Sequence, residues 1–595
     1  MRIRGIKAKT LFRLTLVACL FAANARAETE FMQKFKRDYA ALDMDLLNNM
    51  GERATVKDFV YHKDVATFTF KEGIIHLLRY VDGRPTTAIF VGKGNARIEI
   101  PSHMERQGLL CVTGDSLVDE DFEVAFIRMA DDFDLKLKEK FLFEPKELPW
   151  KMFTIVKQAQ GEVFFRPRIL HTYDNYFQLL RSHYERSDDG FFWIDFHRYV
   201  FTFDPNRPEQ VVVAYELGVA DLVVKECAVF QRQEYGVYDD YQMSSISYPT
   251  TIFEKHGTIE LTGLDGLEVG QAEVTVRVLV NADSLRFLSL FLPSLLKEDS
   301  IQLNGQPVDY YRRKDFEFIG IILPGYFYAG DTLEFTLWYR GKNYDRFLPY
   351  VEDPQACPHT FTFIIPKGVN YYMPGMGEVQ PLDNRRDQIE VTSTNLYNDF
   401  YFYAYVSDID TIPVISDMGI TLNFLKPKSI PKRLLTCYIP DDQYQESITR
   451  SFNFLSSYLG GPPGTFEEYI IPERTASMPG LIQIPQTACV TEGAMEAVGG
   501  FDVVAAASVA RQWFGSLLNP ASDRERWVSE AVPLYLALMF TENERGSAYY
   551  INLLNRRDSI YTMVGLNRDM PLAAGDRAMS SMRINKGVWL LHMLR

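Results

Sequence analysis

Histidine is the commonest metal ligand and general base near neutral pH, and the histidines of this chain of 595 residues are unevenly distributed. No histidine lies between residues 360 and 591. The nine of the chain are His62, His76, His103, His171, His183, His197, His256, His359 and His592. A catalytic zinc ion usually takes three protein ligands and a water molecule. Residues 360–591 therefore lack the imidazoles that a usual zinc hydrolase needs.

Other chemically capable side chains in this region favour structural roles. Ser508 lies in an alanine-rich stretch without the flanking glycines or the nearby histidine of a serine nucleophile. We expect it to fill a small space on a helix. Glu492 and Glu496 are one helical turn apart, which favours a solvated helix face, with a carboxylate-bound calcium ion as the alternative. The region thus offers carboxylates but no complete catalytic set.

The elements that would position these residues are helical. Apolar spacing predicts helices at 444–459, 503–518 and 527–540, the first ended by the sequence GGPP at 460–463. Pro533 lies within the third segment. An internal proline costs about 3 kcal/mol, so it predicts either a strained helix or a helix that starts later.

The preceding residues alternate with a period of two. After an expected opening helix at 31–46, alternation at 65–70, 96–100, 273–278 and 333–339 predicts sheets buried on one face. Gly92-Lys93-Gly94 indicates a turn, and Asn304-Gly305 a hairpin. We predict a multidomain α+β protein with β-rich domains at 28–235 and 236–430 and an α/β domain at 431–595.

The first 27 residues have the pattern of a secretory signal peptide. Six basic residues and no acidic one surround an apolar stretch at 14–23, and Ala25-Arg26-Ala27 offers a cleavage site. The alternative is a lipoprotein, because Leu16-Val17-Ala18-Cys19 is similar to a lipidation box with Cys19 as the anchor. Both alternatives predict export, to the periplasm or the exterior. No later stretch is apolar enough to span a membrane.

The net charge disfavours some classes of partner, and the cysteine content disfavours some kinds of site. Without the signal segment the net charge is -21, which disfavours nucleic acid and anionic membrane surfaces. The five remaining cysteines are widely spaced and form no C-x-x-C pair. Neither a disulfide framework nor a cysteine zinc site is indicated.

Residues 502–535 resemble the zinc site of the membrane alanyl aminopeptidase family, the gluzincin aminopeptidases. In that family a helix with H-E-x-x-H precedes Q-W-F-G, and a glutamate follows 18 residues after the second histidine. Residues 512–515 read QWFG here. The resemblance places Ala507 and Arg511 at the histidine positions, Ser508 at the general-base glutamate, and Glu530 at the third zinc ligand.

Further segments extend the resemblance over residues 240–595. The sequence YLGGPP at 458–463 is similar to the family's glycine-proline turn, and residues 584–587 to its Y-x-K-G helix, with Ile584 at the transition-state tyrosine. Residues 478–482 look like the end of the G-x-M-E-N substrate strand, which implies substrate contacts at Ser477, Met478 and Gly480. The alternative is Glu496 within GAME at 493–496, which is a closer literal match. It lies only 11 residues before Ala507, whereas the family has about 25 to 30 residues between this strand and the first histidine.

The family implies a saddle-like β domain followed by a thermolysin-like domain, with residues 28–235 as an additional domain. The chain stops at Arg595, inside the Y-x-K-G-like helix, where the family continues. Either the fold is reduced, which leaves apolar residues such as Trp589 and Leu594 without their usual cover, or the chain is truncated. Both alternatives describe a C-terminally short thermolysin-like domain.

The substitutions predict loss of zinc, the cofactor of the family. Glu530 alone cannot hold the ion, and the charge of Arg511 repels a dication. We expect Arg511 to pair with Glu530. The leading hypothesis is an exported, zinc-free pseudopeptidase that binds peptides or a protein partner. The alternatives are an active zinc aminopeptidase with unusual ligands and a non-functional, truncated relative.

Overall fold

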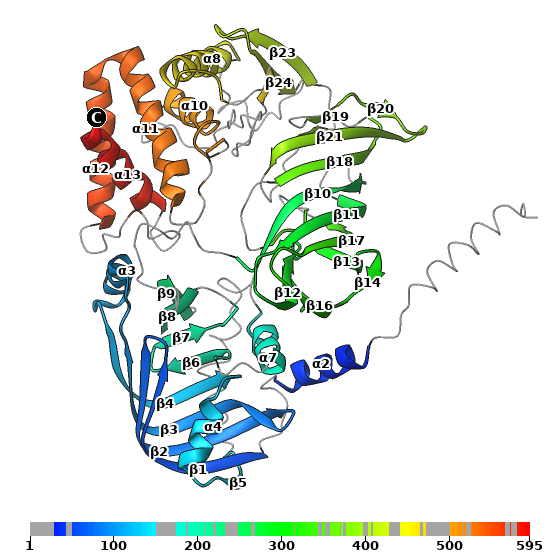
Figure 1. Cartoon of the computed structure of the whole chain (residues 1–595). Coiled ribbons are helices and arrows are strands. Elements are labelled where there is room, and N and C mark those ends of the chain that lie inside the picture. Colours follow the sequence, from blue (N-terminus) through cyan, green and yellow to red (C-terminus); the bar gives the residue numbers. More distant parts are fainter. Residues whose placement is uncertain are drawn as a thin grey trace, which may run out of the picture.

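The structure is a computed structural model. It describes residues 29–42, 50–149, 174–185, 189–206, 209–217, 222–231, 248–262, 268–314, 316–342, 348–351, 357–368, 370–372, 377–396, 403–405, 409–427, 441–463, 468–471, 500–515, 517–518, 520, 525–565, 572 and 580–595. The predicted signal segment with Cys19 lies outside these residues. The predicted order is confirmed at its coarsest level, since β-rich parts precede a helical C-terminal part (Figure 1).

The first part is built on a nine-stranded antiparallel sheet in the order β5-β1-β2-β3-β4-β6-β7-β8-β9. Alternating apolar residues bury one face of this sheet against helices α3 and α4, and its other face against α2 and α7. The elements are α2 (Glu30–Ala41), β1 (Met50–Lys63), β2 (Ala66–Val81), β3 (Arg84–Ile98), α3 (His103–Thr113), β4 (Val118–Met129), α4 (Phe133–Lys140), β5 (Glu144–Glu147), α7 (Asn175–Glu185), β6 (Phe192–Phe196), β7 (Tyr199–Phe203), β8 (Glu209–Leu217) and β9 (Leu222–Gln231).

The turn predicted at Gly92-Lys93-Gly94 is wrong. These residues lie within β3, where a bulge interrupts the pairing with β4 between Val91 and Gly94. A Cβ atom on Gly92 would lie 2.2 Å from the Glu72 carbonyl oxygen, and one on Gly94 would lie 2.3 Å from the Phe122 ring. The glycines are therefore required by close approach within the sheet.

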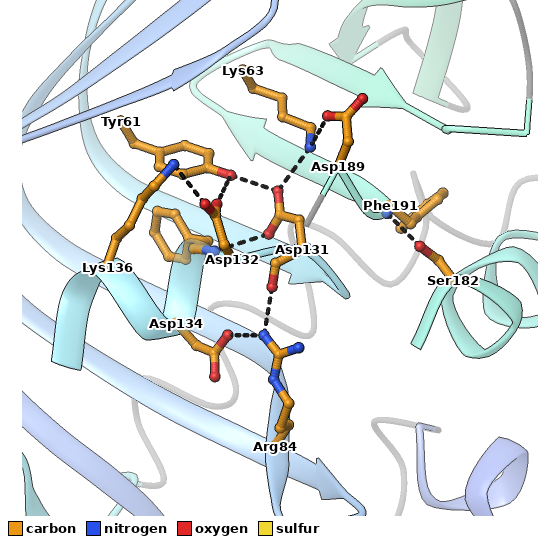
Figure 2. A network of polar contacts seen from close by, with 11 residues as sticks. Tyr61, Lys63, Arg84, Asp131, Asp132, Asp134, Lys136, Ser182, Asp189 and Phe191 are labelled. Atoms are coloured by element: carbon orange, nitrogen blue, oxygen red, sulfur yellow. Dashed lines mark hydrogen bonds and ion pairs between the residues drawn. The ribbon is translucent and has the colours of Figure 1, made fainter. Parts of the chain in front are cut away.

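A polar network connects strands β1 and β3 of this sheet to α4 and the residues before it (Figure 2). The Asp131 carboxylate accepts a hydrogen bond from the Tyr61 hydroxyl (2.6 Å) and pairs with Lys63 (3.2 Å). Burial raises the pKa of Asp131, and the neighbouring Lys63 opposes the shift. Arg84 joins the network through Asp134 and the Asp131 carbonyl. Most of these polar groups are paired with one another, which is typical of a structural network, although Nε of Arg84 has no hydrogen-bond partner among the described residues.

The second part consists of an eight-stranded sheet packed on a three-stranded one. The larger has the order β14-β13-β17-β11-β10-β18-β21-β20, and the smaller β12-β16-β15. The strands are β10 (Thr250–Leu261), β11 (Glu268–Val280), β12 (Leu285–Phe291), β13 (Leu296–Leu303), β14 (Gln306–Pro307), β15 (Asp309–Tyr311), β16 (Phe318–Phe327), β17 (Thr332–Lys342), β18 (Cys357–Pro366), β20 (Gln380–Pro381) and β21 (Arg386–Leu396), with β19 (Asn370–Tyr372) and β22 (Tyr403–Tyr405) as a separate pair.

The hairpin predicted at Asn304-Gly305 is confirmed. Both residues have positive φ, 49° and 76°, and they connect Leu303 to its partner Gln306. Two positive φ values in a two-residue loop are characteristic of a type I′ turn, which suits the twist of antiparallel strands.

An aromatic cluster joins the first two parts. Helices α2 and α7 lie between the nine-stranded sheet and strands β12 and β16 (Figure 1). Phe177 of α7 is fully buried, with ring centroids 5.1 Å from Phe318 and 6.0 Å from Phe287. Gly320 makes room for it, since a Cβ atom there would lie 2.0 Å from the Phe177 ring. The junction is thus a packed core.

The third part has five helices and a three-stranded sheet among its described residues. These are β23 (Ile409–Ile415), β24 (Thr421–Pro427), α8 (Asp441–Tyr458), β25 (Glu468–Ile471), α10 (Phe501–Ala510), α11 (Arg526–Arg545), α12 (Ser547–Gly565) and α13 (Ser580–Leu594). Strands β23 and β24, which we expected in the unit before residue 430, pair with β25, and β24 packs against α8 and α10. No described helix is long and apolar enough to cross a lipid bilayer.

Candidate functional site at helices α10, α11 and α13

Helix α10 carries two of the predicted site positions, and the third is its C-cap. Its alanines and valines form a largely buried helix, in which Ser508 is 4% exposed and Ala507 is partly buried against the same core. Ser508 therefore occupies a core position, as a small residue on a packed helix would. Arg511 is the C-cap of α10, and its N–H donates to the Ala507 carbonyl oxygen at 3.1 Å.

The helix ends at Ala510, so the prediction that it continues to residue 518 is wrong. Gln512 and Trp513 are buried, and Gly515 adopts a φ of +126°, a value that side-chain-bearing residues rarely take. The Leu518 N–H donates back to the Trp513 carbonyl oxygen at 2.8 Å. The sequence QWFG therefore forms a turn, and a Cβ atom on Gly515 would lie 3.3 Å from Cβ of Ser529 on α11.

Helix α11 carries Glu530 in its second turn. The helix begins at Arg526, so Pro533 lies inside it, and the alternative of a helix that starts at the proline is wrong. Pro533 cannot donate a hydrogen bond to the Ser529 carbonyl oxygen, a loss that costs about 3 kcal/mol. Packing of α11 against α10 and α13 compensates, since tertiary contacts supply most helix stability in proteins.

The Glu530 carboxylate is held by Arg583 of α13. Arg583 Nε donates to Glu530 Oε2 and Arg583 Nη2 to Glu530 Oε1, both at 2.7 Å. The Arg583 side chain is 3% exposed and that of Glu530 22%. A bidentate pair of this kind is the strongest arrangement that a carboxylate and a guanidinium form, so both oxygens are engaged within the protein.

The expected pair of Arg511 with Glu530 is corrected by this contact. Within the described part of the chain, the ion pair of Glu530 is the one with Arg583. Arg511 is half-buried. Burial lowers the pKa of its guanidinium, and the charge of Glu530 opposes that shift. Glu530 thus acts on Arg511 through its charge, while its hydrogen bonds go to a different arginine.

The remaining predicted positions are only partly described. Ile584 is half-buried on α13, directly after Arg583. Ser477, Met478 and Gly480 lie outside the described residues, as do Glu492 and Glu496 of the alternative register. The structure therefore brings together α10, α11 and α13 but leaves both versions of the substrate strand as predictions.

The described residues do not fit a zinc ion. Ala507 has no donor atom, the Arg511 guanidinium has no lone pair to offer a metal, and both Glu530 oxygens accept from Arg583. Among the described residues, no group of three or more histidine, cysteine, aspartate or glutamate side chains is placed to bind a metal ion.

Arg583 was not among the residues predicted for this site. One signal was present: Arg583 and Gly587 are one helical turn apart and so share a helix face. A glycine on such a face indicates a close helix contact. A Cβ atom on Gly587 would lie 2.4 Å from Cβ of Ala531, next to Glu530. The face that carries Gly587 is therefore the face that reaches the carboxylate.

Comparisons with known proteins give a limited match. No protein-family model matches this chain, and no curated protein sequence does. Among solved structures, the chain is similar to an M1 zinc metallopeptidase from Deinococcus radiodurans, with a TM-score of 0.44 and 17% identity over 59% of this chain and 83% of that one. A mutant of that enzyme bound to a Tyr-Ser-Ala substrate gives a TM-score of 0.44 and 16% identity over 58% and 83%.

Proposed function

We propose that this protein is an exported, zinc-free pseudopeptidase whose C-terminal part binds peptides or a protein partner. The observation that carries the proposal is the bidentate contact of Arg583 with Glu530, the one residue of the expected ligand set that has metal-binding oxygens in this sequence. A zinc ion would have to displace a buried guanidinium. Breaking a buried pair costs about 3 to 5 kcal/mol, and one carboxylate does not repay that cost.

The loss of the general base supports the same proposal. In a zinc peptidase a carboxylate takes the proton from the metal-bound water. Ser508, at that position, is buried beside the apolar core of this part. Its hydroxyl stays protonated at neutral pH, so it cannot take a proton from water as a carboxylate does. Binding is proposed because the surrounding helices keep a packed core although the residues for hydrolysis are replaced.

Zinc content tests this proposal directly. The purified mature chain is dialysed against a weak chelator, and its zinc is measured by elemental mass spectrometry. We expect essentially none, and no release of amino-terminal residues from aminoacyl substrates. About one zinc per chain, as a three-ligand site retains, together with hydrolysis would contradict the proposal and favour an active aminopeptidase.

A matched variant makes a negative result informative. Ala507→His, Ser508→Glu and Arg511→His restore the family pattern, and Arg583→Ala releases Glu530. If the helices are placed as described, this quadruple variant gains close to one zinc per chain, while the triple variant that keeps Arg583 gains less. A quadruple variant that folds and binds no zinc would show that the register is wrong.

The binding role needs its own measurement. The mature chain and the Trp513→Ala variant, which removes a buried side chain beside α10, are used as baits in an exported fraction. A partner that binds the intact chain and does not bind the variant would support a binding role of the C-terminal part. Retention of no specific partner would favour the non-functional alternative.

A further inference from the structure

Arg511 is a half-buried cation that forms no ion pair with any residue that the structure describes. Within the part of the chain that the structure describes, no carboxylate oxygen lies within 4.0 Å of its guanidinium, and no acceptor takes a hydrogen bond from its side chain. The carboxylate whose charge acts on it belongs to Glu530, and both oxygens of Glu530 accept from Arg583. The hydrogen bonds of Glu530 therefore go to Arg583, and Arg511 receives only the electrostatic influence of this carboxylate.

We infer that Arg511 is an anion receptor and that this site takes an oxyanion, either a carboxylate or a phosphate. The inference rests on the proposed function, because it treats the site as one that holds no zinc. A guanidinium presents five N–H donors in a planar fork that matches both oxyanions. The half-buried guanidinium of Arg511 has lost part of its hydration, and no described residue accepts a hydrogen bond from it in exchange. A bound oxyanion supplies the missing acceptors and balances the charge.

The negative charge of the whole chain means that an anion is attracted only where local groups are positive. The protein is acidic, with a net charge of -15, so its general field repels anions. An anion that binds must therefore be attracted by local groups. Arg511 lies on the C-terminal end of α10, where the helix dipole contributes no attraction for an anion, so the guanidinium itself must supply the binding energy.

Calorimetric titration of the mature chain tests the inference with two probes. Inorganic phosphate represents phosphate sources, and N-acetylalanine represents the carboxyl end of a peptide. We expect at least one probe to bind with a Kd of about 1 mM, and Arg511→Gln to weaken that binding at least tenfold. Tighter binding of phosphate would identify a phosphate source, and tighter binding of N-acetylalanine a peptide carboxylate.

Arg450→Gln is the matched control. Arg450 lies on α8 of the same part, its side chain is 46% exposed, and it already pairs with Glu544 at 2.8 Å. Its loss changes the net charge equally and is expected to leave the affinity for both probes unchanged. Equal weakening by Arg450→Gln would overturn the inference, because the effect would then come from overall charge.

Two further results bear on the inference. If Arg511→Gln does not fold, Arg511→Lys keeps the charge and removes the fork, and N-acetylalanine binding is expected to fall at least fivefold. Failure of both probes to bind the unmodified chain, or undiminished binding by the folded variants, would overturn it. All titrations contain a chelator, so that bound zinc does not contribute to the binding of either probe. The proposed function is tested separately by the zinc content of the protein, and the titrations test only the role of Arg511.

Discussion

Gly587 of α13 lies against Ala531 of α11 so closely that a Cβ atom on the glycine would be 2.4 Å from the alanine Cβ. This contact sets the distance between the two helices at the level of the candidate site. Arg583 is one turn before Gly587, and Glu530 directly precedes Ala531. The close crossing therefore brings the guanidinium and the carboxylate within reach of each other.

The glycine contact predicts a steric effect. Gly587→Ala should destabilise the packing of α13 on α11 by about 1 to 3 kcal/mol, the usual cost of overpacking, although alanine is the better helix former. Amide hydrogen exchange in α13 measures the loss. The double variant Gly587→Ala/Ala531→Gly restores the space and should recover most of the stability. No recovery would mean that the contact does not limit the helix distance.

The buried ion pair predicts strong coupling. Arg583→Met removes the guanidinium that holds Glu530, and Glu530→Leu removes this carboxylate from the buried Arg583, so each change should cost about 3 kcal/mol. Replacing both should cost clearly less than the sum, because the charges are removed together. Hydrogen-exchange protection of α11 and α13 measures the stabilities of the two single variants and the double variant, which form a double-mutant cycle. Additive costs would contradict the bidentate geometry, and Arg450→Met, at an exposed pair, should cost less than about 1 kcal/mol.

The junction of the first two parts predicts a contrast between two glycines of β16. Gly320→Val places side-chain atoms where the Phe177 ring packs and should destabilise the junction by about 1 to 3 kcal/mol. A Cβ atom on Gly325 would have no neighbour within 4 Å, so Gly325→Val should change stability by less than about 0.5 kcal/mol. Hydrogen exchange of α7 reads out the difference. Equal effects of the two variants would show that α7 does not dock on β16.

A buried histidine predicts acid sensitivity of the first sheet. His76 is 2% exposed, its Nδ1 has no hydrogen-bond partner among the described residues, and burial lowers its pKa from 6.5 to about 4. Between these values the unfolded chain binds a proton that the folded chain does not. Stability is therefore lost as the pH falls, by about 2 kcal/mol at pH 5 relative to pH 7.

Exchange protection of β2 at pH 7 and pH 5 measures this loss, and His76→Leu should reduce it. Strand β18 of the second part carries His359, whose pKa is likewise lowered to about 4 by burial. The loss of hydrogen-exchange protection of β18 on acidification should be unchanged in the His76→Leu protein. An unchanged loss in β2 of the variant would mean that another group causes the acid sensitivity.

Local sequence patterns predicted elements better than they predicted where elements end. The alternation in 273–278 and 333–339 predicted strands that β11 and β17 confirm, because a half-buried strand requires period two. The apolar run at 503–518 predicted one helix, and it divides into α10 and a turn. Packing of the turn beside α11 at Gly515 and Ser529 ended the helix, and no pattern within 503–518 contains that contact.

Residue types and the family resemblance together predicted which zinc ligands the candidate site lacks. Alanine cannot ligate and arginine repels a metal cation, so the disagreement with a zinc site at Ala507 and Arg511 was predictable from the order of residues and the resemblance. The carboxylate at Glu530 was predictable in the same way. The partner of that carboxylate was not, since Arg583 is 53 residues away in the chain and reaches it only where two helices cross.

The amino-acid order was thus sufficient to predict the succession from β-rich parts to a helical part and to show that residues 360–591 contain no histidine. Both features depend only on composition and on the local period of apolar residues. The choice of Arg583 over Arg511 depended on the three-dimensional packing. Both arginines carry the same charge, and the close contact of Gly587 with Ala531 gives Arg583 the bidentate geometry while Arg511 stays without an ion pair among the described residues. Long-range packing decides such a choice because a hydrogen bond weakens steeply with distance and angle.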